Sequence, residues 1–243
     1  MFNNKTLLEV DKENVKIMDI MFNKIKSTDI MSYKDALNLK VDLKKRRVFF
    51  ILEGEEVYIK LLTLPKVRGR KLEKIIRNEL IYEFHSIDNI LYNYKIHKEN
   101  KDNIEILVFC VNIDKNIVLK EYLKSNKKIK GIYLIQFCVL EKYKEVIKEE
   151  NFILIMKYKK YIYSIFYKNN EILNNEVIKE NEDLNSKLNK FLFECCGEKH
   201  KCYKKIYTLN IKNLENLKEE LKDFEFIDLG YFNEKLYNTC FKR

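Results

Sequence analysis

The stretch LLTLPKVRGRKLEKIIRNELIYEF, residues 61–84, decides how this chain is organised, because it joins an apolar strand pattern to an amphipathic helix pattern. It contains Pro65, the only proline among the 243 residues. Proline lacks a backbone N–H and moves the preceding residue out of the α region, so we expect a strand to end at Leu64 and the chain to turn there. Beyond the turn, apolar residues at helical spacing predict one buried helix face: Leu72, Ile75, Ile76, Leu80 and Phe84.

The composition is that of a folded protein with an excess of basic over acidic residues. Hydrophobic residues make up 46% of the chain, which is enough for one large domain or two small ones. The net charge of +10 favours nucleic acid or an anionic membrane surface as a neighbour, but 47 basic residues are interleaved with 37 acidic ones and form no sustained block. No stretch is apolar enough for a membrane span, and the N-terminus is no signal peptide, so we expect a cytoplasmic protein.

The remaining pattern predicts two halves that begin alike. Residues 6–25 indicate a two-stranded hairpin with DKEN as its turn, and FILIMKYKKYIYSIFYKNNEIL (152–173) repeats that pattern. RVFFILEGEEVYIKLLTL (47–64) indicates a further strand pair around Gly54. Helices are expected after Ser32, over 114–125 and 136–149, from Leu184 to Cys195, and over NLENLKEEL (213–221). Strands are expected at 90–96, 104–111, 130–135, 205–209 and 224–229, so the order predicts a duplicated α/β architecture.

Three segments together resemble a known family. They are VYIKLLTLPKVRGRKLEKIIRNELIYEFHSIDNILYNYKI, IEILVFCVNIDKNIVLKEYLKS and IKGIYLIQFCVLEKY. They resemble the PilM family of type IV pilus assembly proteins and, more distantly, the cytoplasmic part of the type II secretion protein GspL. The resemblance is best over residues 48–145, and the positions that carry it are Leu64, Pro65, Glu79, Asp88, Tyr92 and Tyr94.

The resemblance implies an α/β fold of the actin-like (ribonuclease H-like) type, as in the cell-division protein FtsA. Residues 1–58 plus 125–150 would form the first half, and residues 59–124 a small inserted subdomain. Residues 151–243 would form a second, shortened half. The bend at Pro65 would then be a strand-to-helix corner within the inserted subdomain.

An actin-like fold normally binds ATP through turns that contain glycine, because only glycine lets backbone N–H groups approach phosphate oxygens. The first turn here has Asp11 but no glycine, and the second, in LIMKYKKYIYS, has neither. YTLNIKN replaces the Gly-Gly motif of the adenosine side. Lys157, Lys159 and Lys160 could attract phosphate, although lysines on a hairpin are more often solvated. We therefore expect no cofactor and no enzyme activity, with an ATPase of the same machine as the alternative.

Other chemistry is sparse in the sequence. The three histidines (His85, His97 and His200) stand without a catalytic motif around them, so no catalytic residue is predicted. The segment CCGEKHKC gathers Cys195, Cys196, His200 and Cys202. Adjacent cysteines splay to different sides of the backbone and fit structural zinc spacing poorly, so we expect a helix end and a polar loop rather than a metal site.

The resemblance implies a non-catalytic scaffold of a type IV pilus or type II secretion-like machine, at the cytoplasmic face of the inner membrane. Its partner would be the cytoplasmic tail of a PilN-like membrane protein, with other pilus proteins as further partners and no nucleic acid. The tail would lie in a groove beside the inserted subdomain, and the expected groove residues are Leu62, Leu64, Pro65, Tyr82 and Tyr94. A basic nucleic-acid-binding protein is the second alternative.

Overall fold

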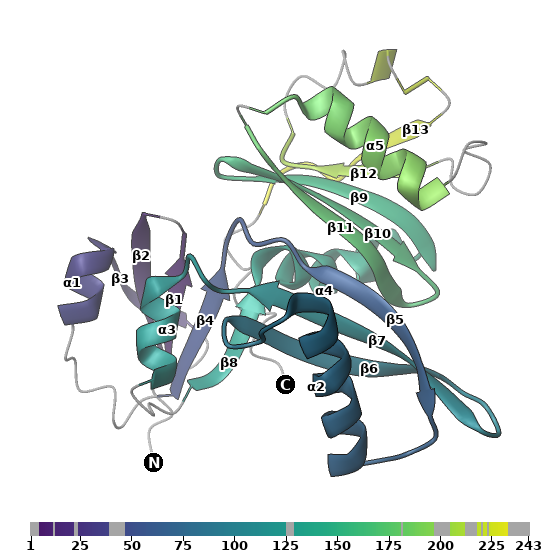
Figure 1. Ribbon diagram of the computed structural model, residues 1–243. Coiled ribbons are helices and arrows are strands. Elements are labelled where there is room, and N and C mark those ends of the chain that lie inside the picture. Colours follow the sequence, from purple (N-terminus) through teal and green to yellow (C-terminus); the bar gives the residue numbers. More distant parts are fainter. Residues whose placement is uncertain are drawn as a thin grey trace.

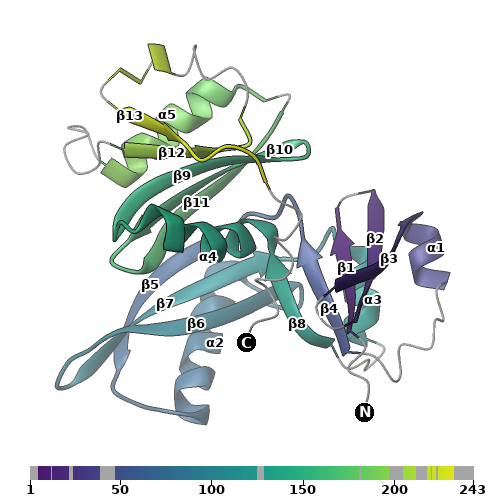
Figure 2. The same ribbon diagram turned by 180° about the vertical axis from the view of Figure 1, so that it is seen from behind.

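The computed structural model describes residues 5–11, 13–21, 24–38, 47–124, 129–180, 182–196, 205–211, 218–219, 221–222 and 224–232. The chain forms two five-stranded sheets and one three-stranded sheet, as Figures 1 and 2 show from opposite sides. Helix α4 lies between the two larger sheets in both views. The two larger sheets are the cores of the two halves that the sequence predicts.

The first half is built on the sheet β3-β2-β1-β4-β8. Antiparallel pairs join β1 to β2 and β2 to β3, whereas β4 lies parallel to β1 and to β8. The strands are β1 (Lys5–Val10), β2 (Asn14–Met21), β3 (Lys24–Ser32), β4 (Arg47–Leu52) and β8 (Ile129–Leu134), and the helices are α1 (Tyr33–Asn38), α3 (Ile117–Lys124) and α4 (Ile135–Ile147). The sequence did not predict β3, whose side chains are mostly exposed and lack the apolar alternation of its neighbours.

The second half repeats the same topology. Its sheet has the order β11-β10-β9-β12-β13, with β9 in the place of β1 and parallel pairs from β9 to β12 and from β12 to β13. The elements are β9 (Asn151–Tyr158), β10 (Tyr161–Lys168), β11 (Glu171–Lys179), α5 (Leu184–Cys196), β12 (Lys205–Leu209) and β13 (Glu225–Asp228). The duplication is thereby confirmed at the level of strand order. The helix expected over 213–221 falls mostly outside the described residues.

The inserted unit is the sheet β5-β7-β6 with one helix across it. Its elements are β5 (Tyr58–Pro65), α2 (Arg70–Phe84), β6 (Ile90–Glu99) and β7 (Asn103–Asn112). The two strands expected around Gly54 both exist but do not pair with each other, because β4 belongs to the first sheet and β5 to this one. We expected the insertion to run to residue 124, and α3 at its end packs into the core of the first half instead.

The corner at Pro65 has the local structure that the sequence predicts. Pro65 is the last residue of β5, an edge strand, where a missing N–H removes no ladder bond. Gly69, with φ at 59°, is the N-cap residue of α2. Leu72, Ile76 and Leu80 are buried in the helix face that packs on the sheet. The apolar stripe of residues 72–84 is therefore the core of the inserted unit.

A shared core joins the two halves. Successive residues of β1 point to opposite faces, so Leu8 packs toward α3 on the outer side. Leu7 packs in the same cluster as Ile135 of α4 and Tyr163 of β10. The two halves thus bury one continuous apolar cluster with α4 at its centre, and they are not two separate domains on a linker.

Two glycines in the left-handed region give a test of this packing. A Cβ at Gly54 (φ 70°) would lie 2.5 Å from the ring of Tyr161, across the junction of the halves, whereas a Cβ at Gly69 (φ 59°) meets nothing within 4 Å. Both alanine variants carry backbone strain of about 1–2 kcal/mol, and Gly54→Ala adds overpacking of about 1–3 kcal/mol. Gly54→Ala should therefore be the more destabilised by chemical denaturation. Equal losses would show that Tyr161 moves aside without strain.

Candidate functional site

A buried ion-pair cluster joins the two hairpins that open the halves, and we call it the clasp (Glu9, Glu53, Tyr158 and Lys159). Glu9 lies on β1 and Glu53 directly follows β4, and both carboxylates are 0% exposed. The Lys159 Nζ atom lies 2.7 Å from Glu53 and 3.3 Å from Glu9. The Tyr158 hydroxyl donates a hydrogen bond to Glu9. One lysine of the second half is therefore held between two carboxylates of the first.

A second ion pair joins the tips of the same hairpins at the surface. Lys160 lies 2.9 Å from Glu13, and both side chains are largely exposed. The two neighbouring lysines of this turn thus differ in their partners. Lys159 contacts the buried side chains of Glu9 and Glu53, and Lys160 contacts the exposed side chain of Glu13. A buried pair in low dielectric is strongly coupled, whereas a surface pair is screened by water and salt.

The protonation of Glu53 follows from its surroundings. Burial is the main cause that raises its pKa, to about 9, and the neighbouring Glu9 carboxylate acts in the same direction. Lys159 acts in the opposite direction but does not reverse the shift. At neutral pH, Glu53 therefore holds a proton, and the charge of the Glu9 carboxylate is balanced by two cations, Lys159 at 3.3 Å and Lys16 at 3.8 Å. The buried Glu9 carboxylate is thus paired, which is how buried charges are tolerated.

The turn of the first hairpin satisfies its own backbone. One carboxylate oxygen of Asp11 accepts hydrogen bonds from the N–H groups of Glu13 and Asn14, each at 2.7 Å. In a phosphate-binding turn, N–H groups of this kind point at the anion. Here an internal carboxylate takes that place, so an incoming phosphate would have to displace it against charge repulsion.

The turn of the second hairpin holds a lysine in a conformation that favours glycine. Lys159 has φ at 51°, in the left-handed region. A non-glycine residue there is strained, and such strain persists where the surroundings hold it in place. The contacts of Lys159 with Glu9 and Glu53 can keep its backbone in this conformation.

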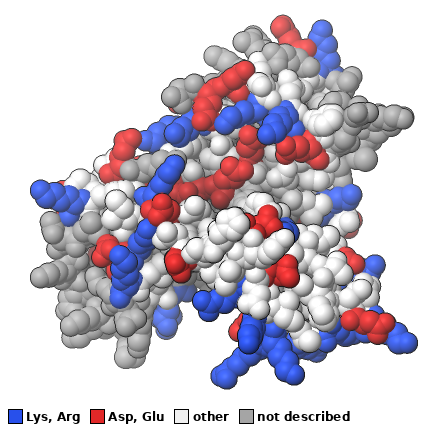
Figure 3. All heavy atoms as spheres, in the orientation of Figure 1, with Lys and Arg blue, Asp and Glu red and all other residues white. Residues whose placement is uncertain are grey.

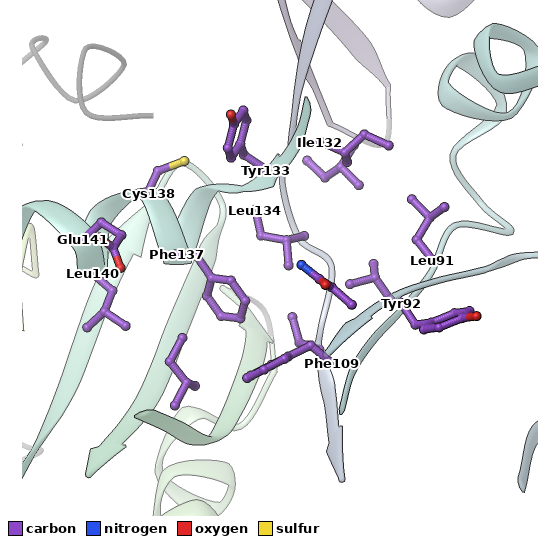
Figure 4. A pocket seen from close by; sticks show the side chains of 15 residues that line it. Leu91, Tyr92, Phe109, Ile132, Tyr133, Leu134, Phe137, Cys138, Leu140 and Glu141 are labelled. Atoms are coloured by element: carbon purple, nitrogen blue, oxygen red, sulfur yellow. The ribbon is translucent and has the colours of Figure 1, made fainter. Parts of the chain in front are cut away.

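An apolar pocket of about 600 Å³ lies where the first half, the inserted unit and the second half meet. Figure 4 shows Phe109 of β7 and Phe137 of α4 directed toward one another. Leu91 on β6 and Ile132 on β8 also line the pocket. The two rings meet edge to face with centroids 6.4 Å apart. The full lining is Leu52, Val57, Leu91, Tyr92, Asn93, Phe109, Val111, Ile132, Tyr133, Leu134, Phe137, Cys138, Leu140, Glu141 and Ile172.

Polar contacts from β11 fix the inserted unit beside this pocket. Asn175 accepts a hydrogen bond from the N–H of Val57 at 3.2 Å and donates one to its carbonyl oxygen. Lys95 lies 2.9 Å from Glu171, which also binds His97. Burial alone would raise the pKa of Glu171, but the hydrogen bonds from Lys95 and His97 hold it below its ordinary value. Glu171 is therefore an ionised anchor at the edge of the pocket.

The five groove residues expected from the sequence lie on the other side of the β5-β7-β6 sheet. Leu62 and Leu64 are buried under α2, and Tyr94 packs partly against the same cluster. Pro65 is exposed at the end of β5, and the side chain of Tyr82 on α2 is 83% exposed. None of the five lines the pocket. Whether they bind a partner stays a proposal.

Strand alternation explains why the pocket residues were missed. Along β6 and β7, alternate residues face α2, and the residues between them, such as Asn93, Phe109 and Val111, face the pocket. β7 is apolar on both faces, with Val108 and Phe109 as neighbours. A strand that is apolar on both faces signals that its second face is covered as well.

Of the segment CCGEKHKC (195–202), the structure describes only the first two residues. Cys195 lies near the end of α5, partly buried, with its sulfur 3.8 Å from the Asn174 amide nitrogen. Cys196 ends that helix, and His200 and Cys202 fall outside the described residues. Within the described ranges, no group of three or more His, Cys, Asp or Glu side chains is placed to hold a metal ion.

Comparison with known proteins identifies the fold. No protein family and no curated protein matches the sequence. Among solved structures, the chain is similar to one titled PilM-PilN type IV pilus biogenesis complex, with a TM-score of 0.59, 10% identity, and coverage of 97% of this chain and 89% of that one. The cytoplasmic domain of EpsL, an inner-membrane component of the type II secretion system of Vibrio cholerae, gives a TM-score of 0.57 at 8% identity, covering 99% and 95%.

A third similar structure is a protein of unknown function with an actin-like ATPase fold from Bacteroides thetaiotaomicron. Its TM-score is 0.54 at 12% identity, with 97% of this chain and 95% of that chain covered. The chain therefore has an actin-like α/β fold, as the resemblance implied. At these identities the likeness establishes the fold alone. None of the helices in the described ranges has the length and apolar content that a membrane crossing requires.

The neighbouring lysines of the second hairpin turn give a matched test of the clasp. Lys159→Met removes one of the two cations that balance the buried Glu9 carboxylate and should lower the free energy of unfolding by about 1–3 kcal/mol, discounted because Lys159 is itself partly exposed and Lys16 remains. Lys160→Met breaks only an exposed pair and should cost less than about 1 kcal/mol. Urea unfolding of both variants measures the difference. Similar losses would mean that the clasp does not join the halves.

The raised pKa of Glu53 predicts how stability depends on pH. Its stabilising contribution is complete below the ordinary carboxyl pKa and is lost as pH rises through about 9. Between pH 7 and 9 the protein should lose about 2 kcal/mol from this group. Glu53→Gln mimics the protonated acid and should flatten the decline, while Glu13→Gln should leave it unchanged. Parallel pH profiles for all three proteins would contradict the assignment of the proton to Glu53.

Proposed function

We propose that this chain is a non-catalytic scaffold of a type IV pilus or type II secretion-like assembly machine. In this proposal it binds the cytoplasmic tail of a PilN-like inner-membrane protein in the apolar pocket. The observation that carries the proposal is the pocket itself, walled by both halves and the inserted unit, in a chain whose fold is similar to that of a PilM-PilN complex. The protein would then act in the cytoplasm at the inner face of the membrane, held there by its partner.

The pocket has the chemistry of a peptide site. It is lined mainly by aliphatic and aromatic side chains, with few polar groups to fix orientation. Two of its strands, β6 and β8, are edge strands of different sheets. An edge strand offers unpaired N–H and C=O groups, and an extended peptide can pair with them while alternate side chains enter the pocket. An extended tail with apolar side chains fits this arrangement.

The clasp supports the scaffold over the ATPase alternative. Glu9 and Glu53 are buried at the junction of the two hairpins, and the Asp11 carboxylate occupies N–H groups of the first turn. Nucleotide phosphates would meet the charged carboxylates of Glu9 and Asp11 without a compensating backbone cradle. Lys159, the cation that could attract a phosphate, is already paired.

The test is binding of a synthetic tail peptide from the PilN-like protein of the same organism. Asn93 is exposed at the pocket, so Asn93→Trp should block the entrance without disturbing the fold, and it should weaken tail binding about tenfold or more by calorimetry. Tyr82→Glu alters the exposed corner expected from the sequence and should leave the affinity unchanged. If Tyr82→Glu weakens binding and Asn93→Trp does not, the tail binds at the corner.

ATP with Mg²⁺, titrated into the same protein, separates the scaffold from the ATPase. We expect no binding heat. Micromolar affinity for ATP together with no affinity for the tail would overturn the proposal in favour of the ATPase. Thermal unfolding of both variants serves as the control, because a cooperative transition at the wild-type temperature shows that the pocket was altered without loss of the fold.

A further inference from the structure

The outer face of α2 carries cations that the described structure does not neutralise. Between residues 66 and 77 the sequence has six basic residues against one acidic residue. Arg70, Lys71, Lys74 and Arg77 are all exposed. Across the described ranges, no carboxylate lies within ion-pair distance of these four side chains, whereas Lys66 and Arg68 at the same end pair with Glu99. Figure 3 shows the basic side chains gathered at the lower end of the molecule, where α2 begins.

This arrangement opposes the stability of the helix that carries it. Arg70 and Lys74 are four residues apart, and Lys71 and Lys74 are three apart, so like charges repel along one face. They also lie in the first turns of α2, where the helix dipole favours acidic residues. Glu73 stands three positions after Arg70 and four before Arg77 and offsets part of this repulsion, whereas Lys71 and Lys74 have no acidic residue three or four positions away on the helix. These unneutralised cations are complementary to an external anion.

The same face ends in exposed apolar side chains. At 100° per residue, Lys71, Lys74, Ile81 and Tyr82 all fall on the side of α2 away from buried Leu72, Ile76 and Leu80. Tyr82 is 83% exposed and Ile81 is 38% exposed. Cations followed by an aromatic and an aliphatic side chain are typical of surfaces that lie at the membrane interface, where headgroups and the apolar boundary meet.

We propose that the outer face of α2, defined by Arg70, Lys71, Lys74, Arg77, Ile81 and Tyr82, binds an anionic lipid surface directly. The face is complementary in charge to acidic headgroups, and its exposed Tyr82 and Ile81 can enter the interfacial layer. This inference extends the proposed function, because it orients the scaffold on the membrane that holds its partner. It does not require the tail, since the pocket lies on the other side of the β5-β7-β6 sheet.

The test uses the purified full chain alone, without tail peptide, in vesicle co-sedimentation. Binding to vesicles of phosphatidylglycerol and phosphatidylcholine is expected to fall with salt, and phosphatidylcholine vesicles alone should bind weakly. The double variant Lys71→Glu, Lys74→Glu should bind about thirtyfold or more weakly, because each basic residue contributes about a factor of five at an anionic surface. Tyr82→Ser should reduce the binding that survives at high salt.

The matched control is Lys115→Glu, Lys130→Glu, which changes the net charge equally at two exposed lysines away from α2. It should retain binding to phosphatidylglycerol vesicles. Equal losses in both double variants would reduce the effect to net charge and overturn the proposal, as would no vesicle binding by the wild type. Salt-sensitive binding to duplex DNA or RNA that exceeds vesicle binding and depends on Lys71 and Lys74 would overturn it in favour of the nucleic-acid alternative. None of these outcomes bears on tail binding, which is measured separately.

Discussion

The placement of Lys159 between Glu9 and Glu53 is the constraint on which the meeting of the two halves depends. Each half opens with a hairpin, and the clasp is where the two hairpins touch. Directly beside it, the Gly54 N–H donates a hydrogen bond to the Tyr163 hydroxyl at 2.8 Å, and Tyr161 and Tyr163 continue into the shared apolar core. A misplaced hairpin would bury a charge without its partner, which costs about 3–5 kcal/mol and therefore disfavours other placements of the two hairpins.

Much of the fold could be predicted because its signals are local. The repeated hairpin pattern predicts the duplicated halves, since two apolar runs around a polar turn are read within twenty residues. Pro65 and the stripe from Leu72 to Phe84 predict a strand end and a buried helix face from steric and periodic rules alone. The absence of glycine from both hairpin turns predicts that backbone N–H groups do not form a phosphate cradle there.

The candidate site depended on contacts between distant parts of the chain, which local rules do not reach. Glu9 and Lys159 are 150 positions apart, and a lysine in a hairpin turn looks solvated until the opposite half is present. The pocket depends on which face of β6 and β7 meets the first half, and apolar residues on both faces leave that choice open. The pairing expected between β4 and β5 was wrong for the same reason, because strands adjacent in sequence need not share a sheet.

The clasp and the wall of the pocket are joined by a short segment of the chain. Only Gly54, Glu55 and Glu56 separate Glu53 in the clasp from Val57 in the pocket wall, and Asn175 and Gln136 hold the backbone between them. A displacement of the pocket wall at Val57 would therefore have only three residues in which to be absorbed before it reached the clasp. Thermodynamic reciprocity then applies: to the extent that filling the pocket shifts the proton equilibrium of Glu53, the proton shifts the affinity of the pocket by the same factor. Under the proposed function, this connection would couple occupancy of the pocket to the fit of the two halves without any nucleotide cycle.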